Sequence, residues 1–140
     1  MLIKNKDIPN IVKALSLMAS LGNTQQDGKA KAFSFKNPGT VRYDLARTFK
    51  RVQAAEEDLT AFQQSLFAQI LAEQNADAAV PATQLNPEHV GKFNAAAAQQ
   101  MEAEVEIDIR PVAIADLDLD NNDIPFSVIG VLLDTVILDK

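Results

Sequence analysis

The longest patterned segment of the chain is residues 40–75, TVRYDLARTFKRVQAAEEDLTAFQQSLFAQILAEQN. Apolar residues recur in it every three or four positions, the spacing of one face of an α-helix. At about 1.5 Å per residue the segment predicts a rod of about 54 Å, longer than a compact domain of this size needs. We therefore expect part of the helix to protrude or to pair. The stripe consists of Val41, Leu45, Phe49, Val52, Ala55, Leu59, Phe62, Leu66 and Ile70.

Shorter helices are predicted on both sides of this segment. An apolar stripe covers residues 7–21, with Asp7 as its cap. Asn86 caps a predicted helix over residues 86–103, and Asp123 is expected to cap a last helix that begins at Ile124. These patterns predict that most of the chain is helical.

The β structure is expected to be small. Apolar and charged residues alternate over residues 105–110, which is typical of a half-buried strand. Short strands are also predicted at residues 1–4, 31–36 and 135–138. The sequence thus predicts one mostly helical α+β domain over residues 1–140, with a long central helix, shorter packed helices and a small β element. That element combines N-terminal short strands with a strand around residues 104–114, and residues 75–86 are interpreted as a flexible linker.

Charge is divided unevenly along the chain, whose net charge is −6. Residues 1–53 contain ten basic and three acidic residues, whereas residues 54–140 contain three basic and sixteen acidic ones. Either the two halves meet within one fold, or copies of the chain dock head to tail. Docking of the second kind would weaken as salt rises, because salt screens exposed charges.

The residues for enzyme chemistry are missing or out of pattern. The chain has no cysteine, and its single histidine, His89, cannot form a structural zinc site. The acidic run from Asp116 to Asp123 lacks the glycine and glutamate that an EF-hand requires. The five glycines form no phosphate-binding loop, and no serine has a nucleophile-elbow context. We predict a protein that is not an enzyme and has no metal or cofactor.

Two sets of residues are candidates for contacts with partners. The first is the exposed or packed part of the long stripe, predicted to be an interface with a second copy or another protein; it consists of Val52, Leu59, Phe62, Leu66 and Ile70. The alternative is a phosphate-binding strip for nucleic acid, because Arg47, Lys50 and Arg51 share one helical face. No apolar run approaches the roughly 20 residues that span a bilayer, so no membrane contact is expected.

The order of elements resembles a group of small proteins encoded by tailed bacteriophages. The similarity lies in a long helix that opens with Tyr43-Asp44-Leu45-Ala46-Arg47 and in a helix that ends in an acidic segment before a strand, here residues 102–109. The chain departs from that group in its longer loop, residues 22–39, and its extended end, residues 135–140. The resemblance implies a phage source and a place in assembly, in the virion or in the early takeover of the host. We therefore expect a structural or assembly protein, with copies of itself or other phage structural proteins as partners, in the host cytoplasm or in the virion. The alternative is a phage-encoded regulator or packaging factor that contacts nucleic acid through the basic N-terminal half of the chain.

Overall fold

The computed structural model describes residues 1–22, 25–26, 29–30, 35, 38–77 and 79–139. Within them most residues are helical and the strands form two-stranded sheets, which confirms the predicted α+β, mostly helical class. The helices are α1 (Ile8–Gly22), α2 (Pro38–Gln74), α3 (Pro87–Glu102) and α4 (Phe126–Leu132), with 3-10 turns η1 (Asn5–Asp7) and η2 (Ile114–Leu117). The strands are β1 (Leu2–Lys4), β2 (Gln25–Gln26), β3 (Lys29–Ala30), β4 (Glu104–Glu106), β5 (Val112–Ala113) and β6 (Ile137–Leu138).

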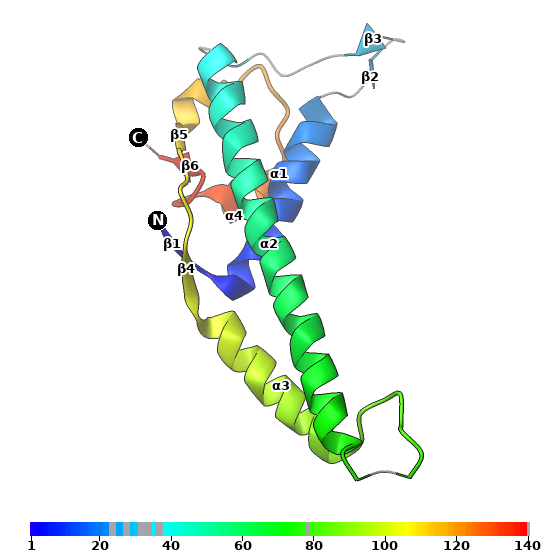
Figure 1. Cartoon of the computed structure of the whole chain (residues 1–140). Coiled ribbons are helices and arrows are strands. Elements are labelled where there is room, and N and C mark those ends of the chain that lie inside the picture. Colours follow the sequence, from blue (N-terminus) through cyan, green and yellow to red (C-terminus); the bar gives the residue numbers. More distant parts are fainter. Residues whose placement is uncertain (23–24, 27–28, 31–34, 36–37, 78, 140) are drawn as a thin grey trace.

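Helix α2 runs the length of the molecule and joins two unlike parts (Figure 1). Its first half packs against α1, and α1 packs in turn against α4. The three helices share one hydrophobic core with residues near β5, η2 and β6. The fully buried side chains of this core include Ile8, Leu117, Leu132 and Ile137. We call this part the body.

The second half of α2 leaves the body and pairs with α3, which returns beside it in the opposite direction (Figure 1). We call residues 60–102 the arm. Leu59 is the last residue of α2 that belongs to the core of the body, and α3 contributes no residue to that core. The protrusion expected from the length of the helix is therefore a two-helix hairpin.

Polar side chains fix the turn at the tip of the arm. The Asn86 side chain accepts a hydrogen bond from the His89 backbone N–H at 2.9 Å, so the predicted cap of α3 is confirmed. In the predicted linker, the Asn75 side chain exchanges two hydrogen bonds with the backbone of Ala82, at 2.9 and 3.1 Å. The Gln74 side chain accepts from the Asn86 backbone N–H at 2.8 Å. These bonds hold Ala82 and Asn86 against the end of α2.

The strand predicted over residues 105–110 is shorter than expected. β4 pairs antiparallel with β1, and the register places Leu2 opposite Glu106. The Ile107 N–H donates to the Met1 carbonyl at 2.9 Å, one residue beyond the three paired positions of β4. Ile107 and Ile109 are nevertheless buried and Asp108 is exposed, as the alternation predicts.

The C-terminal region contains one confirmed and one wrong prediction. The β-branched tail forms β6, which lies parallel to β5 with Val112 opposite Ile137. The predicted Asp123 cap is wrong, because α4 begins at Phe126 and the cap position is held by Pro125, which makes no side-chain cap hydrogen bond.

The strand predicted at residues 31–36 falls almost wholly outside the described residues.

Candidate interaction surface

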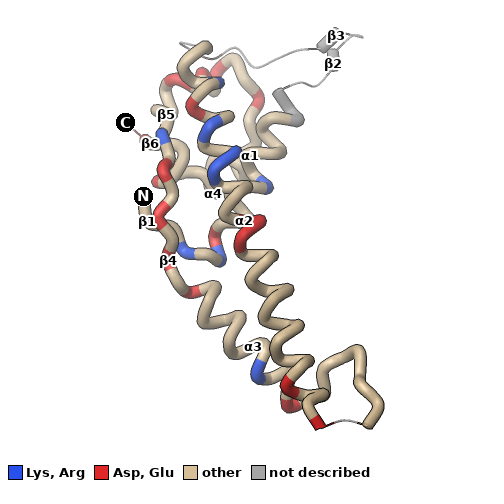
Figure 2. The backbone as a smooth tube through the Cα atoms, viewed as in Figure 1, with Lys and Arg blue, Asp and Glu red and all other residues tan. Residues whose placement is uncertain are grey.

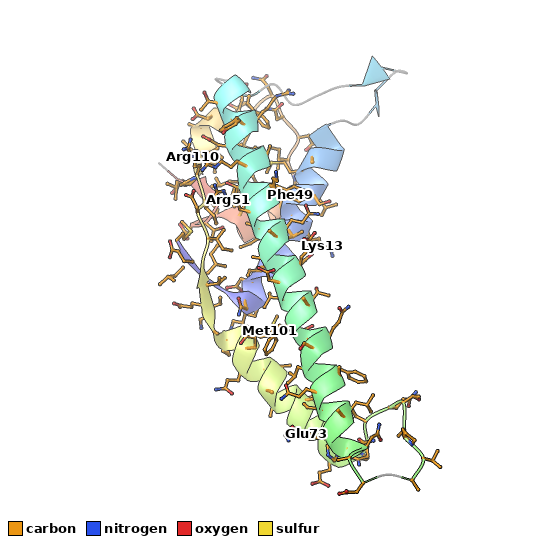
Figure 3. The ribbon with its side chains drawn as sticks, viewed as in Figure 1. Lys13, Phe49, Arg51, Glu73, Met101 and Arg110 are labelled. Atoms are coloured by element: carbon orange, nitrogen blue, oxygen red, sulfur yellow. The ribbon has the colours of Figure 1, made fainter. Side chains whose placement is uncertain are left out.

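The two helices of the arm hold each other through one stripe of side chains. Ile70 is the most deeply buried residue of the arm, at 2% exposure. The rings of Phe67 and Phe93 meet edge to face with their centroids 6.1 Å apart. Nearer the body, the Gln63 amide nitrogen lies 3.9 Å from the sulfur of Met101, which Figure 3 labels beside α2. These contacts define the seam between α2 and α3.

The two sides of this seam differ in chemistry. Successive residues turn by about 100° around a helix, so Gln63, Phe67 and Leu71 follow one flank of α2 at four-residue intervals. Phe62 and Glu73 lie on the opposite flank. The ion pair of Glu73 with Lys92 therefore belongs to the side away from Phe67.

Apolar side chains of both helices gather on the Phe67 side. Met101 is placed there by its contact with Gln63, and Val90 and Ala97 share its arc of α3. Phe67 is 38% exposed and Val90 is 40% exposed, although both belong to residue types that usually pack. We call this side the arm face; it consists of Phe67, Leu71, Val90, Phe93, Ala97 and Met101.

Charged residues are missing from the middle of the arm. Residues 59–72 of α2 and residues 93–101 of α3 contain no Lys, Arg, Asp or Glu. Figure 2 shows this as a long tan stretch between the charged residues of the body and those of the tip. Depletion of charge around exposed aromatic and aliphatic side chains is typical of the core of a protein–protein interface. The arm face therefore has the composition of a docking surface.

The five residues predicted as an interface do not lie on one surface. Val52 and Leu59 are buried in the body, at 0% and 8% exposure, and Ile70 is buried in the arm, at 2% exposure. Leu66 is half-buried, and Phe62 is 40% exposed on the flank opposite the arm face. The stripe thus contains buried, half-buried and exposed residues, and it does not include Phe67 and Leu71 beside it. Their signal in the sequence is the widening of the apolar arc of α2 after Leu66.

The predicted phosphate-binding strip is partly occupied by an acidic side chain. Arg47 and Arg51 both contact one oxygen of Asp108, at 3.2 and 3.1 Å, and Lys50 is exposed. At the foot of the arm, Lys4 and Lys6 both pair with Glu102. These ion pairs join the basic first half of the chain to its acidic second half within one molecule.

Glu102 responds to this surrounding charge. The hydrogen bond from the Lys6 ammonium, followed by that from Lys4, holds the pKa of the Glu102 carboxyl below its usual value of 4.5. The carboxylate lies at the C-terminal end of α3, where the helix macrodipole disfavours negative charge, so the two lysines offset that repulsion.

The acidic run after η2 forms a turn. Asp118 has a left-handed backbone, with φ of 50°, and its carbonyl accepts from the backbone N–H groups of Asn121 and Asn122. The buried Asn122 amide donates to the Leu117 carbonyl at 2.7 Å. Among the residues that the structure describes, no three His, Asp or Glu side chains are grouped so that they could hold a metal ion. Asp118, Asn121 and Asn122 form the hydrogen bonds of this turn.

A shallow groove of about 540 Å³ lies beside the same turn. Its lining includes Leu119, Ile129 and Phe126, whose side chain is 93% exposed.

No helix in the described part of the chain has the length and apolar character needed to cross a membrane. Comparison of the chain with protein-family models, with curated proteins and with solved structures gave no match.

Proposed function

We propose that this chain is a non-enzymatic structural or interaction protein that docks on other protein through the arm face. The observation that carries the proposal is the apolar face on a projecting hairpin whose surrounding residues are uncharged. Exposed apolar surface costs free energy in water, and soluble proteins keep large patches of it mainly where a partner covers them.

The resemblance to small tailed-bacteriophage proteins supplies the setting of the proposal. In that setting the chain is an accessory subunit of the virion or of its assembly, present in the host cytoplasm and then in the particle. Its partners are copies of itself or other structural proteins of the phage. Mass spectrometry of purified particles and of assembly intermediates tests this part, and absence of the chain from both would contradict it.

The nucleic-acid alternative has less support. A phosphate-binding strip needs cationic side chains that are free to meet the backbone of DNA or RNA. Asp108 already holds Arg47 and Arg51, and displacing it would expose a carboxylate to the same phosphates. We therefore favour a protein partner.

Site-specific photo-crosslinking tests the docking role directly. A photoreactive amino acid at Val90, in the full chain expressed where its partners are present, should crosslink to protein. The same group at Ser127, an exposed position on the body, is the matched control and should give little crosslinking. The proposal fails if Val90 and Ser127 crosslink to protein equally weakly.

A further inference from the structure

The arm face is left open by the architecture of the arm. A two-helix hairpin buries one stripe of each helix, and the flanks stay in solvent unless a further layer covers them. The structure describes no buried residue in α3. Covering the face requires protein from outside the described chain.

The arm face is arranged so that it can meet a copy of itself. Along the seam, Leu71 and Val90 lie near the tip, Phe67 and Phe93 in the middle, and Met101 near the body. A two-fold axis through the middle would set the tip of one arm face against the foot of the other. Both ends are apolar, so such an isologous contact brings apolar side chains together along its whole length.

Charge favours this side of the arm over the other. The chain carries a net charge of −6, so two copies repel each other at a distance. Residues 59–72 and 93–101 contain no charged residue, so a contact through the middle of the arm face brings no like charges together. Pairing through the other side would desolvate the Glu73–Lys92 ion pair, which is a cost that the arm face avoids.

The area of the arm face is small for a protein–protein interface. The 16 residues of α3 span about 24 Å, and two adjacent helices each about 10 Å wide give a face of roughly 480 Å². A symmetric contact then buries roughly 1,000 Å² in total, the lower limit of specific interfaces. Such an area fits a weak dimer that depends on concentration.

We propose that the arm face of one copy packs on the arm face of a second copy, antiparallel, to form a four-helix bundle. This inference rests on the proposed docking role and names its partner as the same chain. The contact is apolar, so salt should leave the dimer unchanged or strengthen it by screening the repulsion between the bodies.

Sedimentation of the full chain over a wide range of concentration tests the dimer. We expect a monomer–dimer equilibrium that Val90→Lys weakens at least tenfold in dissociation constant. Lysine is at least as good a helix former as valine, so α3 itself should persist, as circular dichroism can verify. The matched control is Phe62→Lys, because Phe62 is also 40% exposed but lies on the opposite flank. Dimerisation that both variants weaken equally would overturn the assignment to the arm face.

Disulfide crosslinking tests the orientation and does not depend on the lysine variants. The chain has no cysteine, so single cysteines can be introduced cleanly. In an antiparallel bundle, a mixture of the Val90→Cys and Met101→Cys chains should form mixed disulfides, whereas Val90→Cys alone should form few. Efficient crosslinking of Val90→Cys with itself would overturn the antiparallel arrangement.

The failure of the dimer is distinguishable from the failure of the docking role. A chain that stays monomeric at all concentrations, yet photo-crosslinks at Val90 to a different protein, contradicts the dimer and leaves the docking role supported. A chain that is monomeric and gives no protein crosslink at Val90 contradicts both.

Discussion

The body and the arm use the same helix in different ways. In the body, α2 packs against α1 and shares one core with α4, and side chains such as Val52 and Thr48 are completely buried. In the arm, the same helix has only α3 as a neighbour, and Phe62 and Phe67 remain about two-fifths exposed. The apolar spacing is equally regular in both parts. Periodicity therefore identifies which residues face a neighbour, whereas burial depends on how many neighbours the fold supplies.

Matched leucine truncations should give the largest contrast between the two parts. Leu117 is fully buried in the body, so Leu117→Ala should lower the free energy of unfolding by about 3 kcal/mol. Leu66 is half-buried in the arm, and Leu66→Ala should cost less than about 1.5 kcal/mol. Urea unfolding with circular dichroism measures both values. Equal costs would break the comparison by showing that the arm is packed as tightly as the body.

The exposure of Phe62 bears on the same contrast. A fully buried ring at this position would make Phe62→Ala cost about 3 to 5 kcal/mol. With the ring 40% exposed, we expect a cost nearer to that of Leu66→Ala.

Much of the fold follows from local signals in the sequence. The stripe of α2 and the Asn86 cap of α3 depend on residues a few positions apart, and both elements form as predicted. The length of β4 could not be predicted, because it depends on pairing with β1, which is about a hundred residues away in the sequence. The Asp123 cap was wrong for a related reason, since the turn around Asn122 carries the chain past Asp123 before α4 starts.

The arm face was harder to predict than the helices that build it. The residues Val90, Phe93, Ala97 and Met101 were recognisable as the stripe of one helix. Their junction with Phe67 and Leu71 depends on the rotation of α3 about its axis, which is fixed only by contacts between the two helices. The apolar stripe of one helix, read from the sequence, does not predict how that helix is rotated against its neighbour.

Removal of the α3 cap should loosen the arm and spare the body. Asn86→Ala loses the acceptor for the His89 N–H and should destabilise α3 by about 1 kcal/mol. Because the core of the body contains no residue of α3, amide hydrogen exchange should accelerate in the arm and stay unchanged in α1 and α4. The control is Asn94→Ala, at an exposed position inside α3. Equal acceleration throughout the chain would mean that arm and body unfold as one unit.

The ion pairs of Asp108 lie entirely within the body and should have smaller energetic effects. Asp108→Asn weakens the contacts with Arg47 and Arg51, which are exposed enough that we expect a loss of about 0.2 to 1 kcal/mol. The variant also frees the two guanidinium groups. We expect no DNA or RNA binding by the unaltered chain at low salt, and weak salt-sensitive binding by Asp108→Asn.

Glu104→Gln serves as the control for this experiment, because it changes the net charge equally at an exposed position in β4. Tight binding of DNA or RNA by the unaltered chain would instead support the phosphate-binding strip.

The joint between arm and body should show the smallest effect, and it should depend on pH. The Lys6 and Lys4 ammonium groups contact Glu102 at 3.0 and 3.4 Å and lower the pKa of its carboxyl in the folded chain. A group whose pKa is lower in the folded state stabilises it above the usual pKa, and this contribution is lost as the pH falls through the folded value. Acid should therefore loosen the joint below about pH 4.5, and Glu102→Gln should remove that part of the pH dependence.

Carboxyl chemical shifts measured by NMR during an acid titration report the pKa of Glu102 directly. Lys6→Gln should raise this pKa towards 4.5, and Lys4→Gln should raise it less, because the Lys6 hydrogen bond is the larger cause. Both lysines belong to the body and Glu102 is the last residue of α3, so the titration reads the contact between the two parts. A Glu102 pKa that neither lysine variant changes would show that the two lysines do not hold the arm. The hydrogen bonds of Asn5 to the Gln100 and Ala103 carbonyls would then be what joins α3 to the body.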